Sequence, residues 1–152
     1  MMDLTFTWNR LEDFSALALY DILRARESVF IVEQQCVYQE ADGLDLKAWH
    51  LAVRTGDTLV AYARVVEPGL KYDEPSIGRV MTLPAFRHLK VGRALVAEAI
   101  AFTEKTYPGA GIRIGAQAQL QKFYGELGFR PVGGVYDDDG IPHIDMVKSP
   151  AG

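Results

Sequence analysis

Cysteine and histidine are scarce in this chain, and their scarcity argues against two kinds of site. The 152 residues include one cysteine, Cys36, and three histidines. A single cysteine cannot form a disulfide within the chain, and it fits a reducing compartment. One cysteine and scattered histidines also lack the ligand spacing of a zinc site. We therefore expect no internal disulfide and no metal.

Long apolar runs and an excess of positive charge are missing as well. No run approaches the ~20 residues that a membrane-spanning helix needs, although 49% of the residues are hydrophobic. The first residues, MMDLTFTWNRLEDF, carry acids and lack the basic start and apolar centre of a secretory signal. The formal net charge of -4 argues against binding nucleic acid through its phosphates. We expect a cytoplasmic protein that binds neither membrane nor nucleic acid.

Hydrophobic periodicity predicts alternating strands and helices in one domain that spans residues 1–152. LTFTW alternates like a strand, residues 13–31 have a helical period, and the turn RTGD joins WHLAV to TLVAYARVVE as a hairpin. PSIGRVMTL is the next strand, followed by a helix over residues 91–102 and the strand IRIGAQ. LQKFYGELGF is a short helix that ends at Gly128, and DDDGIP joins PVGGVY to HIDMVK. This order predicts a mixed α/β (α+β) fold with one core.

The stretch VMTLPAFRHLKVGRA, residues 80–94, joins a strand end to a helix start through a glycine and several cations. Unpaired N–H groups and the positive dipole end allow a helix start to hold phosphate. Gly92 has no Cβ, so a ligand can approach its backbone closely, and Arg87, Lys90 and Arg93 would add positive charge. A plain helix start with solvated cations is the alternative. The patterns G-x-x-x-x-G-K-S/T and G-x-G-x-x-G are both lacking.

RHLKVGRA resembles the pyrophosphate-binding motif of the GNAT superfamily of N-acetyltransferases, written Q/R-x-x-G-x-G/A. Arg87 takes the first position and Gly92 the last, while Lys90 stands where a glycine is expected. FIVEQQCVYQEADGLD, LVAYARV, IGRVMT, GAQAQLQKFYGELGF and YDDDGIPHIDM are similar to the ElaA-type branch of the family, in which this lysine is expected. These segments cover most of the chain from Phe30 to Met146. The resemblance implies a mixed, mostly antiparallel central sheet flanked by helices.

The resemblance also implies a reaction. It implies an acyltransferase that moves the acetyl group of acetyl-CoA directly to a primary amine, on a small molecule or a peptide. The alternative is a module that binds acyl-CoA without turnover. The family pattern does not define the acceptor, implies no metal, and is compatible with a homodimer.

By this resemblance, coenzyme A binds along the strand end, the turn and the later helix. Its diphosphate would lie on the backbone of residues 89–94, and N–H groups near Val80 and Met81 would bind the thioester oxygen. Tyr124 would hydrogen-bond or protonate the leaving thiolate, since a phenol with a pKa of about 10 carries its proton at neutral pH beside a thiolate with a pKa of about 8.5. Core packing is the alternative for Tyr124, whereas for Phe123 core packing or simple packing against the cofactor is favoured. The cofactor contacts we predict are Val80, Met81, Thr82, Arg87, His88, Leu89, Lys90, Val91, Gly92, Arg93, Ala94, Gln119, Phe123 and Tyr124.

The general base has several candidates. Glu33 follows the first helix, His50 lies in a predicted strand, and His143 begins the last strand. A histidine has an ordinary pKa of about 6.5, which suits a base, but a histidine in a strand is more often structural. Glu33 could instead anchor the acceptor, and a chain of water molecules could serve as the base.

The acceptor site has candidates in strands whose patterns are typical of burial. Arg64 and Arg79 lie in such strands, where an arginine usually needs a carboxylate partner. Glu33, Asp42 or Asp45 could supply that carboxylate, or the arginines could bind a carboxylate of the acceptor. The acidic loop over residues 40–45 suits a cationic amine but is equally typical of a solvated loop. The acceptor contacts we predict are Glu33, Gln34, Arg64, Arg79 and Gln117.

Overall fold

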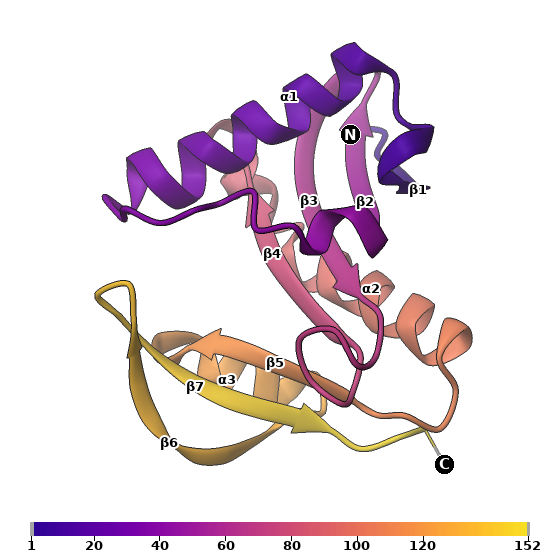
Figure 1. The fold of residues 1–152 in the computed structure, drawn as a ribbon. Helices are drawn as coiled ribbons and strands as arrows, with labels where there is room; N and C mark the ends of the chain where they lie inside the picture. The colour runs from indigo at the N-terminus through magenta and orange to yellow at the C-terminus, as the bar shows by residue number, and fades with distance from the viewer. Residues whose placement is uncertain (1, 152) are drawn as a thin grey trace.

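Strands of the computed structural model, which describes residues 2–151, form two antiparallel sheets (Figure 1). The first sheet contains, in spatial order, β1 (Thr5–Arg10), β2 (Ala48–Thr55), β3 (Thr58–Val66) and β4 (Ser76–Thr82). The second sheet contains, in spatial order, β5 (Ile112–Gln117), β7 (Ile141–Lys148) and β6 (Arg130–Asp138). The mixed and mostly antiparallel fold expected from the sequence is confirmed.

Two helices cover opposite faces of the first sheet (Figure 1). The helix α1 (Ala16–Arg26) packs on Ala52 and Tyr62, whereas α2 (Gly92–Thr106) packs on Leu51 and Val53. Side chains alternate along a strand, so each central strand can bury one set of residues under each helix. A short helix, α3 (Gln121–Glu126), lies beside the second sheet. Within residues 2–151, no helix has both the length and the hydropathy of a membrane-spanning segment.

The first helix is shorter than its apolar period predicts. It begins after Ser15, whose hydroxyl caps the helix by accepting a hydrogen bond of 3.1 Å from the backbone N–H of Ala18. It gives way at Glu27–Glu33 to a wider π-helical segment, after which the N–H of Cys36 bonds the carbonyl of Ile31. The hydrophobic pattern does not distinguish this wider turn from an α-helical one. Glu33 ends the π-helical segment and Gln34 follows it, and both residues line the open groove described below.

Short 3-10 turns connect several elements. They span Leu11–Asp13, Leu44–Lys47, Pro84–Leu89 and Ala118–Leu120. The segment between the predicted strand and the predicted helix contains the 3-10 turn Pro84–Leu89, which lies between β4 and α2.

The two sheets meet at β4 and β5 and then part. The N–H of Arg113 bonds the carbonyl of Pro75 at 3.0 Å, and from this point the two strands take different directions (Figure 1). β4 also contains a bulge, because Arg64 faces Gly78 and Tyr62 faces Met81, which leaves two β4 residues opposite one on β3. One of these two, Arg79, has a φ of 49°. Residues of both parted strands line the cleft that is described below.

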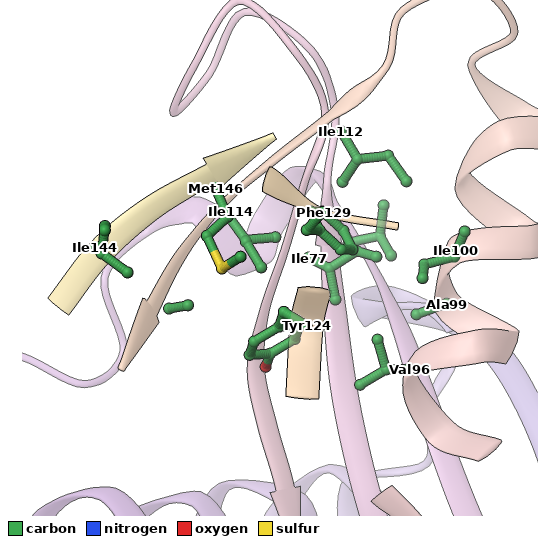
Figure 2. Packing of buried hydrophobic residues seen from close by; sticks show 12 residues of the cluster. Ile77, Val96, Ala99, Ile100, Ile112, Ile114, Tyr124, Phe129, Ile144 and Met146 are labelled. Carbon is green, nitrogen blue, oxygen red and sulfur yellow. The ribbon is translucent and has the colours of Figure 1, made fainter. Parts of the chain in front are cut away.

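A hydrophobic cluster joins the second sheet to α2 and α3 (Figure 2). Ile112, Ile114 and Met146 supply the sheet side, while Val96 and Ile100 supply the α2 side. Tyr124 and Phe129 complete the cluster at its α3 end. The core therefore holds α3, and with it Tyr124, in a fixed position beside the parted strands.

Candidate functional site

Two adjoining hollows open where β4 and β5 part. The polar cleft, of about 340 Å³, lies between the sheets and is lined by charged residues that include Asp42, Arg64, Lys71, Arg79, Asp138 and His143. The open groove, of about 590 Å³, runs toward the start of α2 and includes Glu33, Met81, Thr82, Arg87, Gly92 and Phe123. The residues that line both hollows are Phe30, Val80, Gln117, Leu120 and Tyr124.

Tyr124 lies at the junction of the two hollows. Its side chain is 8% exposed and belongs to the hydrophobic cluster, and its hydroxyl points away from Phe129 (Figure 2). Burial alone raises the pKa of Tyr124 to about 12, and no described residue forms a hydrogen bond with its hydroxyl. The hydroxyl therefore stays protonated at physiological pH and can donate a proton but cannot serve as a base.

The start of α2 is open to the groove. Among the described residues, no side chain caps the helix at Val91, so the N–H groups of its first turn lack side-chain partners there. A Cβ placed on Gly92 would meet no atom of the described part of the chain within 4 Å. Lys90 has a φ of 55°, a left-handed conformation that glycine adopts most easily. The backbone therefore fits an anion at this helix start.

Two of the three cations at this turn already hold carboxylates. Arg87 donates to both oxygens of Glu33, at 2.6 and 2.7 Å, and Arg93 donates to Glu126 at 2.6 Å. The hydrogen bonds from Arg87 lower the pKa of Glu33, which makes this carboxylate a weaker base than an ordinary glutamate. Glu33 also lines the open groove and not the polar cleft. The structure gives it a role in holding Arg87.

His50 lies outside both hollows, which corrects the prediction of this residue as a base. Its side chain is buried, and both ring nitrogens are occupied. Nε2 donates to the carbonyl of Asp45 at 3.0 Å, so Nδ1 accepts from the hydroxyl of Tyr62. Burial is the largest cause that lowers the pKa of His50. The histidine is a neutral structural residue.

His143 faces the polar cleft, as a base would. Its Nδ1 lies 2.7 Å from the carbonyl of Ile141, and a carbonyl can only accept, so Nδ1 carries the proton in the neutral ring. Nε2 then has its lone pair, and it lies 4.0 Å from a carboxylate oxygen of Asp138. A lone pair beside a carboxylate can accept a proton from a bound amine.

A network of charged side chains forms one wall of the polar cleft. Arg64 donates to Asp42 and Asp45 at 2.9 and 3.0 Å, and Arg79 donates to Glu40 at 2.7 Å and Asp42 at 3.2 Å. The predicted need for carboxylate partners is met by the loop before β2. Glu33 is not among these partners, contrary to one of the alternatives.

Arg26 lies at the buried centre of the same network. It is fully buried, and it donates to Glu40 at 3.0 Å and to both oxygens of Asp45 at 2.8 and 3.1 Å. Burial raises the pKa of Asp45, but the hydrogen bonds and charges of Arg26 and Arg64 outweigh burial and hold it below the ordinary value. The sequence did not single out Arg26, because an arginine at a polar position of a helix is ordinary.

The other predicted site residues lie in the open groove, in the hydrophobic core or outside both hollows. Gln34 and Gln119 line the open groove, and Gln119 donates to the side chain of Gln117 at 3.1 Å. Leu89 and Val91 pack against the hydrophobic core, so only their backbone can face a ligand. Neither hollow is lined by the side chains of His88, Leu89, Lys90, Val91, Arg93 or Ala94.

Several cleft residues were not predicted from the sequence. Lys71 lies in the loop GLKYDEP, which carries no motif, and Asp138 and Asp139 were interpreted only as hairpin residues. The hairpin itself is correct, since Asp139 and Gly140 form the turn with positive φ values of 51° and 85°. Their part in the cleft depends on the packing of the two sheets.

Comparison with known proteins places this site in a family. Residues 12–150 match the family model described as "Acetyltransferase (GNAT) domain". A UPF0039 protein of Synechocystis is 48% identical over 147 residues, which cover 96% of each chain. The crystal structure of Escherichia coli ElaA matches with a TM-score of 0.90 and 38% identity, and covers 97% of this chain and 100% of its own. The crystal structure of an acyl-CoA N-acyltransferase from Pseudomonas aeruginosa matches with a TM-score of 0.91 and 38% identity, and also covers 97% of this chain and 100% of its own.

These matches span almost the whole chain, and the two solved structures share its overall fold. The resemblance inferred from RHLKVGRA is therefore confirmed. The chain belongs to the GNAT acetyltransferase family, in the branch that contains ElaA.

Proposed function

We propose that this protein transfers the acetyl group of acetyl-CoA directly to a primary amine. The observation that carries the proposal is the Tyr124 hydroxyl, which has no hydrogen-bond partner among residues 2–151 and lies where the open groove meets the polar cleft. Membership of the GNAT family supports acyl transfer as the class of reaction. The position of Tyr124 supports one site that spans both hollows, with the thioester near the junction and the amine in the cleft.

The open groove suits coenzyme A. The unpaired N–H groups at the start of α2 can hold its diphosphate, and the space around Gly92 leaves room for it. The bulge beside Val80 interrupts the regular pairing of β4 where it lines both hollows. N–H groups near Val80 and Met81 can therefore bind the thioester oxygen, as the resemblance implied. When bound, acetyl-CoA supplies an activated acetyl group.

His143 and Tyr124 divide the proton transfers between them. An amine attacks only when it is unprotonated, and Nε2 of His143 can accept its proton in the polar cleft. Tyr124 keeps its proton at physiological pH because burial raises its pKa to about 12. It can donate that proton, or a hydrogen bond, to the sulfur that leaves. His143 thus serves the attacking amine, and Tyr124 serves the leaving thiolate.

The test of the reaction is a screen of primary amines that follows release of free thiol from acetyl-CoA. Saturating acetyl-CoA should also stabilise the fold, by about 2.7 kcal/mol at 100 times its dissociation constant. A raised melting temperature with thiol release supports the transferase. A raised melting temperature without thiol release from any amine supports the alternative, a module that binds acyl-CoA without turnover. No thermal shift and no heat of binding would contradict both.

Tyr124→Phe tests the mechanism with the acceptor that the screen provides. The change removes one hydroxyl and leaves the ring in the hydrophobic cluster, so the fold and the affinity for acetyl-CoA should be kept. Turnover should fall by about tenfold or more, which is ~1.4 kcal/mol in the barrier. Phe123→Leu is the matched control, because Phe123 is next to Tyr124 and lines only the open groove. Turnover at the parent rate, with chemistry limiting, would exclude Tyr124 as the proton donor.

A further inference from the structure

Arg79 keeps part of its guanidinium free at the polar cleft. Its Nε and Nη2 donate to Glu40 and Asp42, while Nη1 forms no hydrogen bond with the residues that the structure describes. The guanidinium also lies 5.5 Å from the ring of Tyr38, which lines the same cleft. Glu40 and Tyr38 thus fix the direction of Arg79, and two N–H donors remain available to a ligand.

Lys71 is a second cation of this cleft, and unlike Arg79 it has no carboxylate partner among the described residues. Its ammonium lies 5.5 Å from the ring of Tyr72 and makes no ion pair within residues 2–151. Lys71 is exposed as a residue, but partial loss of water around its ammonium lowers its pKa, and the positive charges of Arg64 and Arg79 lower it further. The carboxylates of Asp42 and Asp138 act in the opposite direction and do not cancel this effect. A bound anion would relieve this repulsion between like charges.

The charges of the cleft are separated between its walls. On the first-sheet side, Arg26, Arg64 and Arg79 are balanced by Glu40, Asp42 and Asp45, so Lys71 is an unmatched cation there. The β6–β7 turn of the second sheet brings Asp138 and Asp139 to the same cleft, next to His143. A cleft with an unmatched cation on one wall and carboxylates on another is complementary to a molecule that carries both charges.

We propose that the acceptor is a small amine that also carries a carboxylate, of the amino-acid class. Nη1 of Arg79 and the ammonium of Lys71 bind the carboxylate, while Asp138 and His143 face the amine. The volume of about 340 Å³ suits a molecule of this size. A second cationic group in place of the carboxylate would meet Lys71 and Arg79, so a diamine is disfavoured. This inference rests on the proposed transferase function and names its substrate class.

The first experiment compares matched amines. The proteinogenic amino acids, and β-alanine, are offered as acceptors beside their carboxamides, and L-lysine beside cadaverine. The expected result is that kcat/KM is at least about tenfold higher for the best amino acid than for its carboxamide, since a charge-assisted hydrogen bond is lost. Equal or better turnover of the carboxamides, or of cadaverine over L-lysine, would overturn the proposal.

A charge-removing variant then locates the effect. Lys71→Gln should raise KM for the amino acid by about tenfold, leave kcat nearly unchanged, and leave the carboxamide unaffected. Lys71→Arg should restore most of the affinity because it keeps the positive charge. Lys105→Gln is the matched control, since Lys105 lies at the end of α2 and lines neither hollow. A KM for the amino acid that is unchanged in Lys71→Gln would exclude Lys71 as its carboxylate site.

A binding measurement separates this proposal from the proposed function. In ¹H–¹⁵N spectra of the protein without acetyl-CoA, L-methionine and L-glutamate should shift the amides of Lys71, Gly78 and Arg79, and their carboxamides should not. Such shifts without any thiol release would support the ligand class and contradict the transferase. Thiol release together with equal shifts for amino acids and their carboxamides would support the transferase and contradict the ligand class.

Discussion

Arginines cluster at two places in this protein, and the two clusters differ in how their positive charges are neutralised. Beneath the loop before β2, Arg26 and Arg64 are buried and donate to three carboxylates that the protein itself supplies. At the start of α2, Arg87 and Arg93 form exposed ion pairs, and the helix N–H groups beside them have no side-chain partner. The first place is closed, whereas the second is open to a ligand.

The difference follows from the cost of burying charge. A guanidinium taken out of water needs partners at all times, because an unpaired buried charge costs several kcal/mol. An exposed ion pair contributes little and can be exchanged for a ligand phosphate. The closed network therefore shapes one wall of the polar cleft, and the open turn remains available for binding. Changes in the two places should have separate effects, on stability in one and on affinity in the other.

Arg26→Ala should have the largest effect, on stability. The change leaves Asp45 and Glu40 without their central partner in the buried network, and breaking a buried pair costs about 3–5 kcal/mol. Urea denaturation should show a lower midpoint with an unchanged slope. Arg93→Ala removes an exposed pair and should cost less than ~1 kcal/mol. Equal losses in the two variants would contradict the distinction between a closed and an open place.

The second largest effect should come from acid, which should lower the stability that the buried arginine–carboxylate network provides. The pKa values of Asp42 and Asp45 lie below their ordinary values in the folded protein. Arg64 and Arg79 outweigh the effect of burial at Asp42, and Arg26 and Arg64 outweigh it at Asp45. The unfolded chain therefore takes up protons first as pH falls, and the stability from these carboxylates is present above about pH 4 and lost below it. The free energy of unfolding measured in urea between pH 7 and pH 3 should show this loss. In Arg26→Ala the loss should be smaller; an equally steep loss would assign it to other carboxylates.

Gly92→Asp should act on affinity and spare the fold. Its Cβ would meet open space, and an acid in the first turn of a helix is favourable, so the melting temperature should be kept. The new charge would repel the diphosphate, and calorimetry should show at least about tenfold weaker binding of acetyl-CoA, or ~1.4 kcal/mol. Gly92→Ala adds the Cβ without charge and should lose less. Unchanged affinity in Gly92→Asp would falsify the placement of the diphosphate at this turn.

Lys90→Gly should have the smallest effect. Relief of the left-handed backbone is worth roughly 1 kcal/mol, but glycine also makes the unfolded chain more flexible, so the net gain in stability should stay below ~1 kcal/mol. Loss of the charge should weaken acetyl-CoA binding a few-fold, roughly, and flatten its dependence on salt. A glycine variant that binds more tightly would show that Lys90 does not contribute to the affinity.

The sequence predicted the elements that depend on local pattern. RTGD marked the β2–β3 hairpin, Gly128 marked the end of α3 with its φ of 103°, and DDDG marked the last hairpin. These features depend on residues next to one another in the chain. The need of Arg64 and Arg79 for carboxylates was also predictable, because it follows from burial alone.

Features that depend on packing were not predictable. Asp42 and Asp138 reach the same cleft from loops about a hundred residues apart, and only the meeting of the two sheets brings them together. His50 and His143 both lie in strands, and no local pattern shows that one points into the core and the other into the cleft. The left-handed backbone of Arg79 likewise arises from the bulge and has no local signal.

The hairpin that brings Asp138 to the cleft has a consequence at the outer edge of the second sheet. β6 is an edge strand and is exposed along most of its length, which makes it a template on which another chain could add a strand. Its pairing with β7 is interrupted between Val132 and Tyr136, where Gly133 has a φ of 78°. The irregular edge and the run of aspartates at its end disfavour such addition. The acidic turn that lines the polar cleft on the inside thus also disfavours aggregation through this outer edge.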